Sequence, residues 1–196
     1  MATTPKRAAV QKAVLRATEE LLEAGASWAD LGVERITTAA GISRTAFYFY
    51  FRDKRELLMR LTEEITEDLY VEAERWYHGD GEPEDVMREA IGKISALYRE
   101  HAPLIKAIVE VSTYDDEVAV FWRSLLERFV TASTERIAAE QALGTALPMP
   151  AQATAFALTW MTERTLYQQL VQERFSEEEL VEALVGLWHR GVYGRV

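Results

Sequence analysis

Residues 33–59 read VERITTAAGISRTAFYFYFRDKRELLM, and this order predicts a short helix, a tight turn, a second short helix and the start of a long third one. Val33 to Ala40 places apolar or small residues on one helical face. Gly41 can take the left-handed backbone conformation that ends a helix, and the Ser43 hydroxyl can cap the backbone N–H groups of the next. Two short helices separated by three residues indicate a DNA-reading helix-turn-helix.

The second short helix carries a continuous aromatic run. Ile42 and Phe47 are placed to fill the small core of the motif. The other positions are left largely outward: Arg44, Thr45, Ala46, Tyr48, Phe49 and Tyr50. Such a run is often ordinary core, but consecutive aromatic residues span a full turn, and one side of a thin helix cannot bury them all. An outward aromatic face suits contact with a sugar–phosphate backbone and with thymine methyl groups.

The outward residues of this helix have distinct expected contacts with DNA. Arg44 is expected to bind a base edge, since a guanidinium can make a bidentate contact with guanine in the major groove. The other expected contacts are with bases or thymine methyl groups for Thr45 and Ala46, with phosphates for Tyr48, Tyr50 and Lys54, and with the sugar edge for Phe49.

Three segments of the chain resemble a known family. AAGISRTAFYFYFRDKRELL, residues 39–58, resembles the helix-turn-helix of the TetR family of bacterial repressors. The segments ALTWMTERTLYQQLVQE (157–173) and GLWHRGVYGR (186–195) resemble the late segments of the EthR subgroup of that family. Two positions depart from the family pattern. Thr37 stands where Ala is usual, and no Ser or Thr cap lies near Gly32, so the first helix of the motif is expected to begin less firmly.

The resemblance covers nearly the whole chain and implies an all-α fold. Residues 1–52 are expected to form a three-helix DNA-binding domain, and residues 53–196 a helical ligand-binding and dimerisation domain. Breaks between helices are predicted at Gly25, the 41–43 turn, 79–83, 101–103, 112–116, 144–150 and 174–176. Asp53 is the predicted cap of a long helix, and Ser176 with Glu179 forms a capping box. No alternating stretch is long enough for a strand, so about nine helices are expected.

Composition is that of an ordinary soluble protein. The 196 residues are 48% hydrophobic and 28% charged. No run approaches the roughly 18 apolar residues that cross a bilayer, and the first ten residues lack the apolar core of a signal peptide, so no membrane contact and a cytoplasmic location are expected. The chain has no cysteine, which excludes disulfides, thiolate catalysis and cysteine-ligated zinc.

The net charge of −10 is unevenly divided along the chain. Residues 1–60 carry ten Lys or Arg against seven Asp or Glu, whereas residues 61–196 carry twelve against twenty-five. A weakly basic N-terminal part can approach phosphates while an acidic remainder is repelled, which disfavours nonspecific coating of nucleic acid.

The last two predicted helices carry wide apolar stripes, over residues 152–173 and 176–193. By pattern alone such a pair can close its own domain. The resemblance instead implies a four-helix bundle with the same pair of a second subunit, hence a homodimer. Two recognition helices held at a fixed separation are also what a pair of DNA half-sites requires.

The C-terminal part is expected to hold an elongated apolar tunnel. Its candidate lining residues are Val86, Met87, Ile91, Ile94, Tyr98, Trp122, Leu126, Phe129, Thr159, Thr162, Tyr167 and Trp188. By pattern these are ordinary core, and it is the resemblance that implies a tunnel there. Thr159 and Thr162 match two amide side chains of EthR-like proteins. Because a threonine offers one hydroxyl where an amide offers a carbonyl and two N–H donors, the ligand preference is expected to differ.

The expected function is a ligand-responsive transcriptional repressor. An elongated apolar molecule would fill the tunnel, shift the long helix and release a dimer from operator DNA. An enzyme is the competing class, but His78, His101 and His189 show no metal-ligand spacing and no glycine-rich phosphate loop is present, so no metal or cofactor is expected. A helical carrier protein without regulatory role is the other alternative, and it would need no aromatic recognition face.

Overall fold

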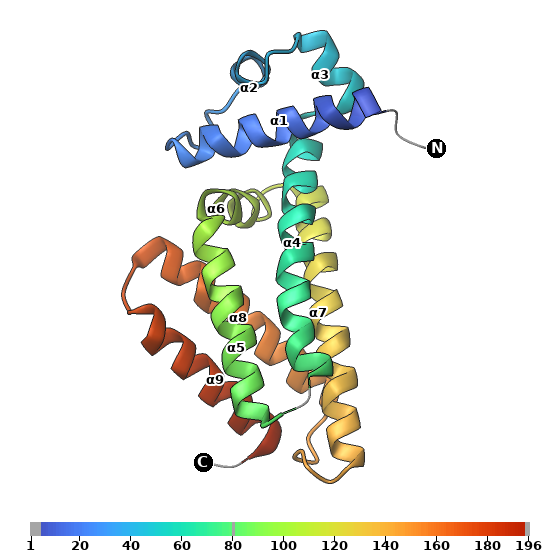
Figure 1. The fold of residues 1–196 in the computed structure, drawn as a ribbon, viewed down its shortest axis with the longest axis vertical. Helices are drawn as coiled ribbons and strands as arrows, with labels where there is room; N and C mark the ends of the chain where they lie inside the picture. The colour runs from blue at the N-terminus through green and yellow to red at the C-terminus, as the bar shows by residue number, and fades with distance from the viewer. Residues whose placement is uncertain (1–4, 80, 195–196) are drawn as a thin grey trace. The chain divides into compact units, whose positions relative to one another are not determined.

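The computed structural model describes residues 5–79 and 81–194 (Figure 1). Within these ranges the chain forms nine α-helices and no strand, which confirms the predicted all-α class. The helices are α1 (Pro5–Glu23), α2 (Val33–Ala39), α3 (Arg44–Tyr50), α4 (Lys54–His78), α5 (Pro83–Glu100), α6 (Ala102–Val111), α7 (Asp116–Ala142), α8 (Ala151–Gln172) and α9 (Glu177–Tyr193). None of them, in the part of the chain described, is long and apolar enough to cross a membrane.

The chain divides into two compact units, which differ from the expected division after residue 52. Unit 1 contains the described residues up to Glu64 together with Pro103–Ala119, and unit 2 contains Ile65–Ala102 and the described residues from Val120 onward. The difference arises because α4 is one continuous helix that contributes to both units, and because α6 belongs almost wholly to unit 1. A functional boundary after residue 52 stays a prediction.

The helix-turn-helix of unit 1 is built as its local sequence predicts. Helix α1 packs against α2, and α2 packs against α3. Gly41 has a φ of +67°, and the Ser43 Oγ accepts a hydrogen bond from the Ala46 N–H at 3.1 Å, which confirms both the turn and the cap. Gly32 makes no side-chain cap, as its sequence implies, and α2 is only seven residues long. Thr37 is accommodated in the core because its hydroxyl donates to the Glu34 carbonyl at 3.0 Å.

Phe47 is the centre of the small core beneath α3. Its side chain is fully buried, as is that of Phe51, and the two ring centroids lie 5.3 Å apart. Ile36 of α2 and Leu57 of α4 are also fully buried in this unit. Ile42, which was expected to share the role of Phe47, is only half-buried. The core of the motif therefore rests on the inward aromatic residues of the run and on aliphatic residues of α2 and α4.

Two predicted caps and most predicted breaks are confirmed. The Asp53 Oδ1 accepts from the Glu56 N–H at 2.8 Å, and Ser176 and Glu179 form a reciprocal capping box before α9. The break predicted at residues 101–103 is shorter than expected, because α6 already begins at Ala102. Pro103 fits inside the first turn of α6, where its missing N–H would have no helical partner.

Helices α5, α8 and α9 of unit 2 pack against one another, and the later part of α4 runs beside α7 (Figure 1). The pairing of α4 with α7 is fixed by an edge-to-face contact of Tyr70 with Phe129, whose ring centroids are 5.4 Å apart. Arg128 of α7 also holds both carboxylate oxygens of Glu67 on α4, at 2.6 and 3.1 Å. These helices enclose a cavity between them.

Candidate functional site

Helix α3 presents most of the residues predicted to contact DNA. Phe49 is 71% exposed and Tyr48 is 46% exposed, while Arg44 and Thr45 are also exposed. Ala46 and Tyr50 are half-buried. The Arg44 guanidinium lies 5.8 Å from the centroid of the Tyr48 ring, and the Phe49 and Tyr50 rings meet edge to face at 5.1 Å. The aromatic run is therefore shared between the core and an uncovered face.

Lys54 is held differently from the other predicted DNA-contacting residues. Its Nζ donates to the Trp28 carbonyl at 2.6 Å and lies 4.7 Å from the centroid of the Trp28 ring. Burial lowers the pKa of Lys54, against the attraction of Asp30. An ammonium carries three N–H groups, so two remain beside the bond to Trp28. The contact of Lys54 with phosphate stays a prediction. The same ammonium group also links the start of α4 to the loop that contains Trp28.

A cluster of charged residues in unit 1 connects the start of α4 with the start of α7, and no local sequence pattern predicts it. Arg52 pairs with Glu117, and the Arg55 Nη1 lies 3.3 Å from Asp115 and 3.1 Å from Glu117. The hydrogen bond and charge of Glu117, with the charge of Asp53, raise the pKa of Arg52. Burial opposes ionisation of Asp53, but the N–H of Glu56 and the two arginines outweigh it and lower the pKa of that carboxyl. Both arginines near α3 are thus already paired with carboxylates.

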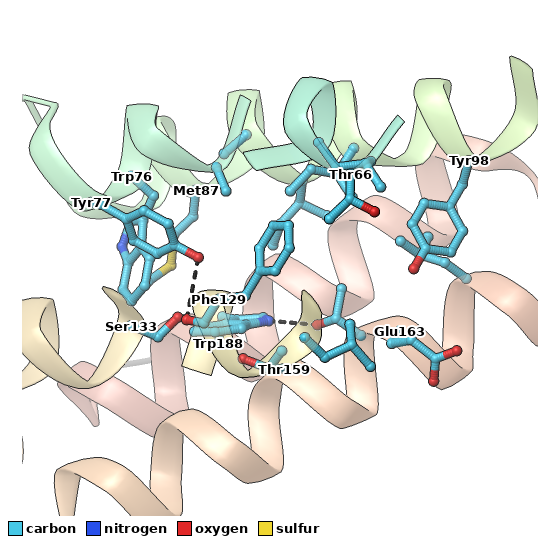
Figure 2. Close-up of a pocket in the computed structure, with 18 of the residues that line it drawn as sticks. Thr66, Trp76, Tyr77, Met87, Tyr98, Phe129, Ser133, Thr159, Glu163 and Trp188 are labelled. Atoms are coloured by element: carbon cyan, nitrogen blue, oxygen red, sulfur yellow. Dashed lines mark hydrogen bonds between the residues drawn. The ribbon is translucent and has the colours of Figure 1, made fainter. Parts of the chain in front are cut away.

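The cavity of unit 2 has a volume of about 90 Å³ (Figure 2). A single buried water needs roughly 10–15 Å³ of such space, so the cavity is large enough for a small organic molecule. Helices α4, α5, α7, α8 and α9 all contribute to its wall. Most lining side chains are apolar or aromatic, which is typical of a small-molecule site.

Ten of the twelve predicted lining residues surround this cavity: Met87, Ile91, Ile94, Tyr98, Trp122, Leu126, Phe129, Thr159, Thr162 and Trp188. Val86 and Tyr167 are not part of its lining. Val86 lies beside the turn at Gly79 and Gly81, and Tyr167 is covered by the Arg164 guanidinium at 5.2 Å from its ring centroid. That any of these residues binds a ligand stays a prediction.

Sequence reasoning missed the α4 wall and several small or polar positions: Thr66, Leu69, Ala73, Trp76, Tyr77, Ala90, Ser133, Glu163 and Leu166. The α4 residues recur at helical spacing, and that apolar period is the sequence signal that could have identified them. Glu163 could not have been found in this way, because a charged residue in an amphipathic helix is ordinarily solvent-exposed.

The two threonines at the expected amide positions differ in their hydrogen bonds. The Thr162 Oγ1 donates to the Leu158 carbonyl at 2.9 Å and accepts from the Trp188 Nε1–H at 2.7 Å, the bond drawn in Figure 2. The Thr159 Oγ1 is buried and has no hydrogen-bond partner among the described residues. Thr162 therefore positions the Trp188 ring, and Thr159 is the one with a hydroxyl left to bind another molecule.

Glu163 is a buried carboxylate with no hydrogen bond to either oxygen in the part of the chain described. The residue is 3% exposed, and its nearest cation is Arg164, whose Nε lies 3.7 Å from Oε2. That distance is too long for a hydrogen bond, and the Arg164 side chain is half in solvent, so the attraction is weak. Burial raises the pKa of Glu163, with only partial opposition from Arg164. Figure 2 places Glu163 and Tyr98 at one end of the cavity, and Trp76 and Tyr77 at the other.

The raised pKa of Glu163 implies that this residue lowers the stability of the folded protein at neutral pH. We expect Glu163→Gln to be more stable than the parent at neutral pH, by about 1–3 kcal/mol, because it removes a buried charge that Arg164 compensates only weakly. An acid whose pKa is higher in the folded state loses stability as pH rises from its ordinary value through the raised one. The groups that face Glu163 are the Tyr98 hydroxyl, whose pKa burial raises further above its ordinary value, and the Arg164 guanidinium. Urea unfolding between pH 4 and pH 8 measures the effect.

The advantage of the glutamine variant should grow with pH across that range. A glutamine variant less stable than the parent at neutral pH would instead show that the carboxylate has a stabilising partner.

Comparisons with known proteins agree over most of the chain. A family model described as "Bacterial regulatory proteins, tetR family" matches residues 14–61, and one for the C-terminal domain of the transcriptional regulator EthR matches residues 87–194. An HTH-type transcriptional regulator EthR from Mycobacterium tuberculosis is 30% identical over 187 residues, covering 93% of this chain and 86% of the relative. The EthR of Mycolicibacterium smegmatis is 28% identical over 193 residues, with 94% and 86% covered.

Solved structures resemble the fold at lower sequence identity. A putative TetR-family regulator from Syntrophomonas wolfei has a TM-score of 0.77 at 16% identity, covering 92% of this chain and 93% of that one. Another from Mesorhizobium loti has a TM-score of 0.74 at 16% identity, covering 98% and 100%. At such identities these two structures support the fold alone.

Proposed function

This chain belongs to the TetR family as an EthR-like transcriptional regulator, not an enzyme, and on that premise we propose that it represses transcription as a homodimer bound to operator DNA. An apolar small molecule that fills the cavity of unit 2 would release it. The protein would act in the cytoplasm, where its DNA target lies. The observation that carries the proposal is that one chain has both an exposed aromatic helix, α3 in unit 1, and an apolar cavity in unit 2.

The exposed face of α3 supports the DNA-binding half of the proposal. Phe49 is the most exposed aromatic residue of the helix, in a position where burial against DNA would remove its ring from water. Arg44 would read a base edge, Tyr48 and Tyr50 would bind phosphates through their hydroxyls, and Thr45 would meet bases beside Arg44. A carrier protein gains nothing from an exposed aromatic face of this kind.

Uncovered apolar residues on α8 and α9 support a homodimer through these helices. Phe156 and Val171 of α8 are 51% and 52% exposed, and Leu187 of α9 is 47% exposed. The same two helices bury Leu166 and Leu184 inside unit 2. The apolar residues of α8 and α9 thus lie on two sides of each helix. One side packs inside unit 2, and a second copy of the chain would cover the other, so both alternatives that the sequence left open can apply.

Helices α4 and α7 offer a route for the ligand response. Both line the cavity, and each begins in unit 1, at the charged cluster around Arg52 and Arg55. Filling the cavity would shift these helices and move two recognition helices away from the half-site spacing. Couplings of this kind are typically about 1–3 kcal/mol, or roughly fivefold to 150-fold in DNA affinity.

Two substitutions separate base reading from phosphate binding. Arg44→Ala should weaken binding by about 1–3 kcal/mol and relax selectivity at one base pair. Lys54→Met should weaken all sequences alike and lower the salt slope of the affinity by about one. Because Lys54 also binds Trp28, its variant must first show an unchanged thermal melt. Fluorescence anisotropy with an operator and its single-base variants measures both effects, and the reverse pattern would show that the roles are wrongly assigned.

A gel shift with DNA flanking the gene tests the function as a whole. Repression predicts a shift that weakens with salt and is reversed by an apolar compound that binds the cavity. The absence of any shift at low salt would favour the carrier protein and reject the repressor.

A further inference from the structure

Within residues 5–79 and 81–194, the one charged group in the lining of the cavity lies at the end where α8 and α5 meet. There the carboxylate of Glu163 offers two acceptor oxygens, both buried and without hydrogen-bond partners among the described residues. The other lining atoms without a partner in the part of the chain described are neutral, and they include the Thr159 hydroxyl and the indole N–H groups of Trp76 and Trp122. A buried acceptor without a donor is unfavourable, and a buried charge without a counter-charge is more so. This end of the cavity is therefore chemically incomplete, and what it lacks is a hydrogen-bond donor, preferably a positive one.

The walls of the cavity suit the same kind of ligand. Its lining includes six aromatic side chains, namely Trp76, Tyr77, Tyr98, Trp122, Phe129 and Trp188. Faces of such rings attract organic cations as well as apolar groups. The surrounding part of the chain also has an acidic excess, with twenty-five Asp or Glu against twelve Lys or Arg in residues 61–196, which raises the local concentration of cations over anions.

We propose that the ligand of this cavity is an organic amine, whose protonated amino group pairs with Glu163 and whose apolar body extends toward Trp76 and Tyr77. A neutral ligand with acceptors alone would leave Glu163 uncompensated, and a carboxylate ligand would add a like charge beside it. The assignment deepens the proposed function, and its regulatory meaning rests on that function, but the binding itself does not.

The geometry sets the size of the amine. Glu163 lies at the end of the cavity opposite Trp76 and Tyr77, so head group and body occupy opposite ends (Figure 2). A volume of about 90 Å³ is several times the space of one water and suits a single ring on a short chain. A primary phenylalkylamine combines these features.

Calorimetric titration of the full chain with three matched probes tests the proposal. 4-Phenylbutylamine, 4-phenylbutan-1-ol and 4-phenylbutanoate share a body and differ in the charge of the head group. At pH 7.5 we expect the amine to bind about tenfold more tightly than the alcohol, and the carboxylate to bind least, because a charge-assisted bond replaces a neutral one. Equal affinity for amine and alcohol, tightest binding of the carboxylate, or no binding of any probe would overturn the assignment.

Glu163→Gln shows whether the preference comes from this carboxylate. The variant keeps the shape of the side chain, and we expect it to bind the amine no better than the alcohol while its affinity for the alcohol is unchanged. The matched control is Glu127→Gln, which removes the same charge from an exposed position on α7 and should retain the tenfold preference. A glutamine at 163 that retains the preference would contradict the proposal.

A DNA readout separates this proposal from the function on which it builds. Tight amine binding that leaves the operator complex intact would support the ligand class and reject ligand-controlled repression. Release of DNA by the alcohol and the amine at equal concentrations would support repression and reject the role of Glu163.

Discussion

Replacing Phe47 by alanine is expected to lower the free energy of unfolding by about 3–5 kcal/mol and to abolish DNA binding. The side chain is fully buried between α3 and the helices beneath it, and its ring packs on Phe51 and Tyr48. Truncation leaves a cavity that a core this small cannot fill by relaxation. Helix α3 then loses the packing contact that holds it in position for DNA. Urea unfolding followed by circular dichroism measures the stability, and anisotropy with operator DNA measures the binding.

Phe49→Ala is the matched control, because it makes the same chemical change two residues away in the same helix. The Phe49 side chain is 71% exposed, so its truncation should change stability by no more than about 0.5 kcal/mol and still weaken DNA binding. If both variants lost stability equally, the aromatic run would be core on both sides and α3 would have no free face for DNA.

The combined substitution Phe156→Glu and Leu187→Glu is expected to convert the proposed homodimer to a monomer and to reduce operator affinity by roughly 10²-fold to 10⁴-fold. These side chains belong to the uncovered face of α8 and α9 that the proposal assigns to the dimer. Each carboxylate would have to be buried against its own copy, without a counter-charge. A monomer also loses the gain in effective concentration that comes from binding two linked half-sites.

Sedimentation equilibrium gives the mass of the variant, and Val71→Glu is its control. Val71 on α4 is 57% exposed, outside the face of α8 and α9, so the same kind of change there should leave both mass and affinity unaltered. An unchanged mass for the double variant would move the dimer interface elsewhere on the surface.

The helix-turn-helix could be predicted because its signals are local. The positive φ of Gly41, the cap made by Ser43 and the inward turn of Phe47 each depend on a few adjacent residues. The bond from Lys54 to the Trp28 carbonyl joins residues 26 apart, and no local pattern announces it. Local rules therefore located the recognition face but could not show that one of its predicted cations is already bound to the protein.

The cavity was partly predictable for a related reason. Apolar periodicity and family resemblance together predicted ten lining residues. They indicate which side of each helix faces inward, but not how much empty space remains between the packed helices. Trp76 and Tyr77 were missed because they lie on α4, whereas every expected lining residue lies later in the chain. Glu163 was missed because sequence alone does not distinguish a charged residue facing a cavity from one facing water.

The pairing of Arg52 and Arg55 with Asp115 and Glu117 has a consequence for the living bacterium. Arg52 and Arg55, which lie close to α3 in the sequence, already form ion pairs with carboxylates of the protein. They would therefore displace few of the cations condensed on DNA when the protein binds. When a cell accumulates potassium under osmotic stress, the DNA affinity falls for proteins that bind DNA mainly through unpaired lysines and arginines. If this regulator represses as proposed, its operator complex would still weaken with salt but less than theirs, so that a chemical inducer would remain the main signal that opens the promoter.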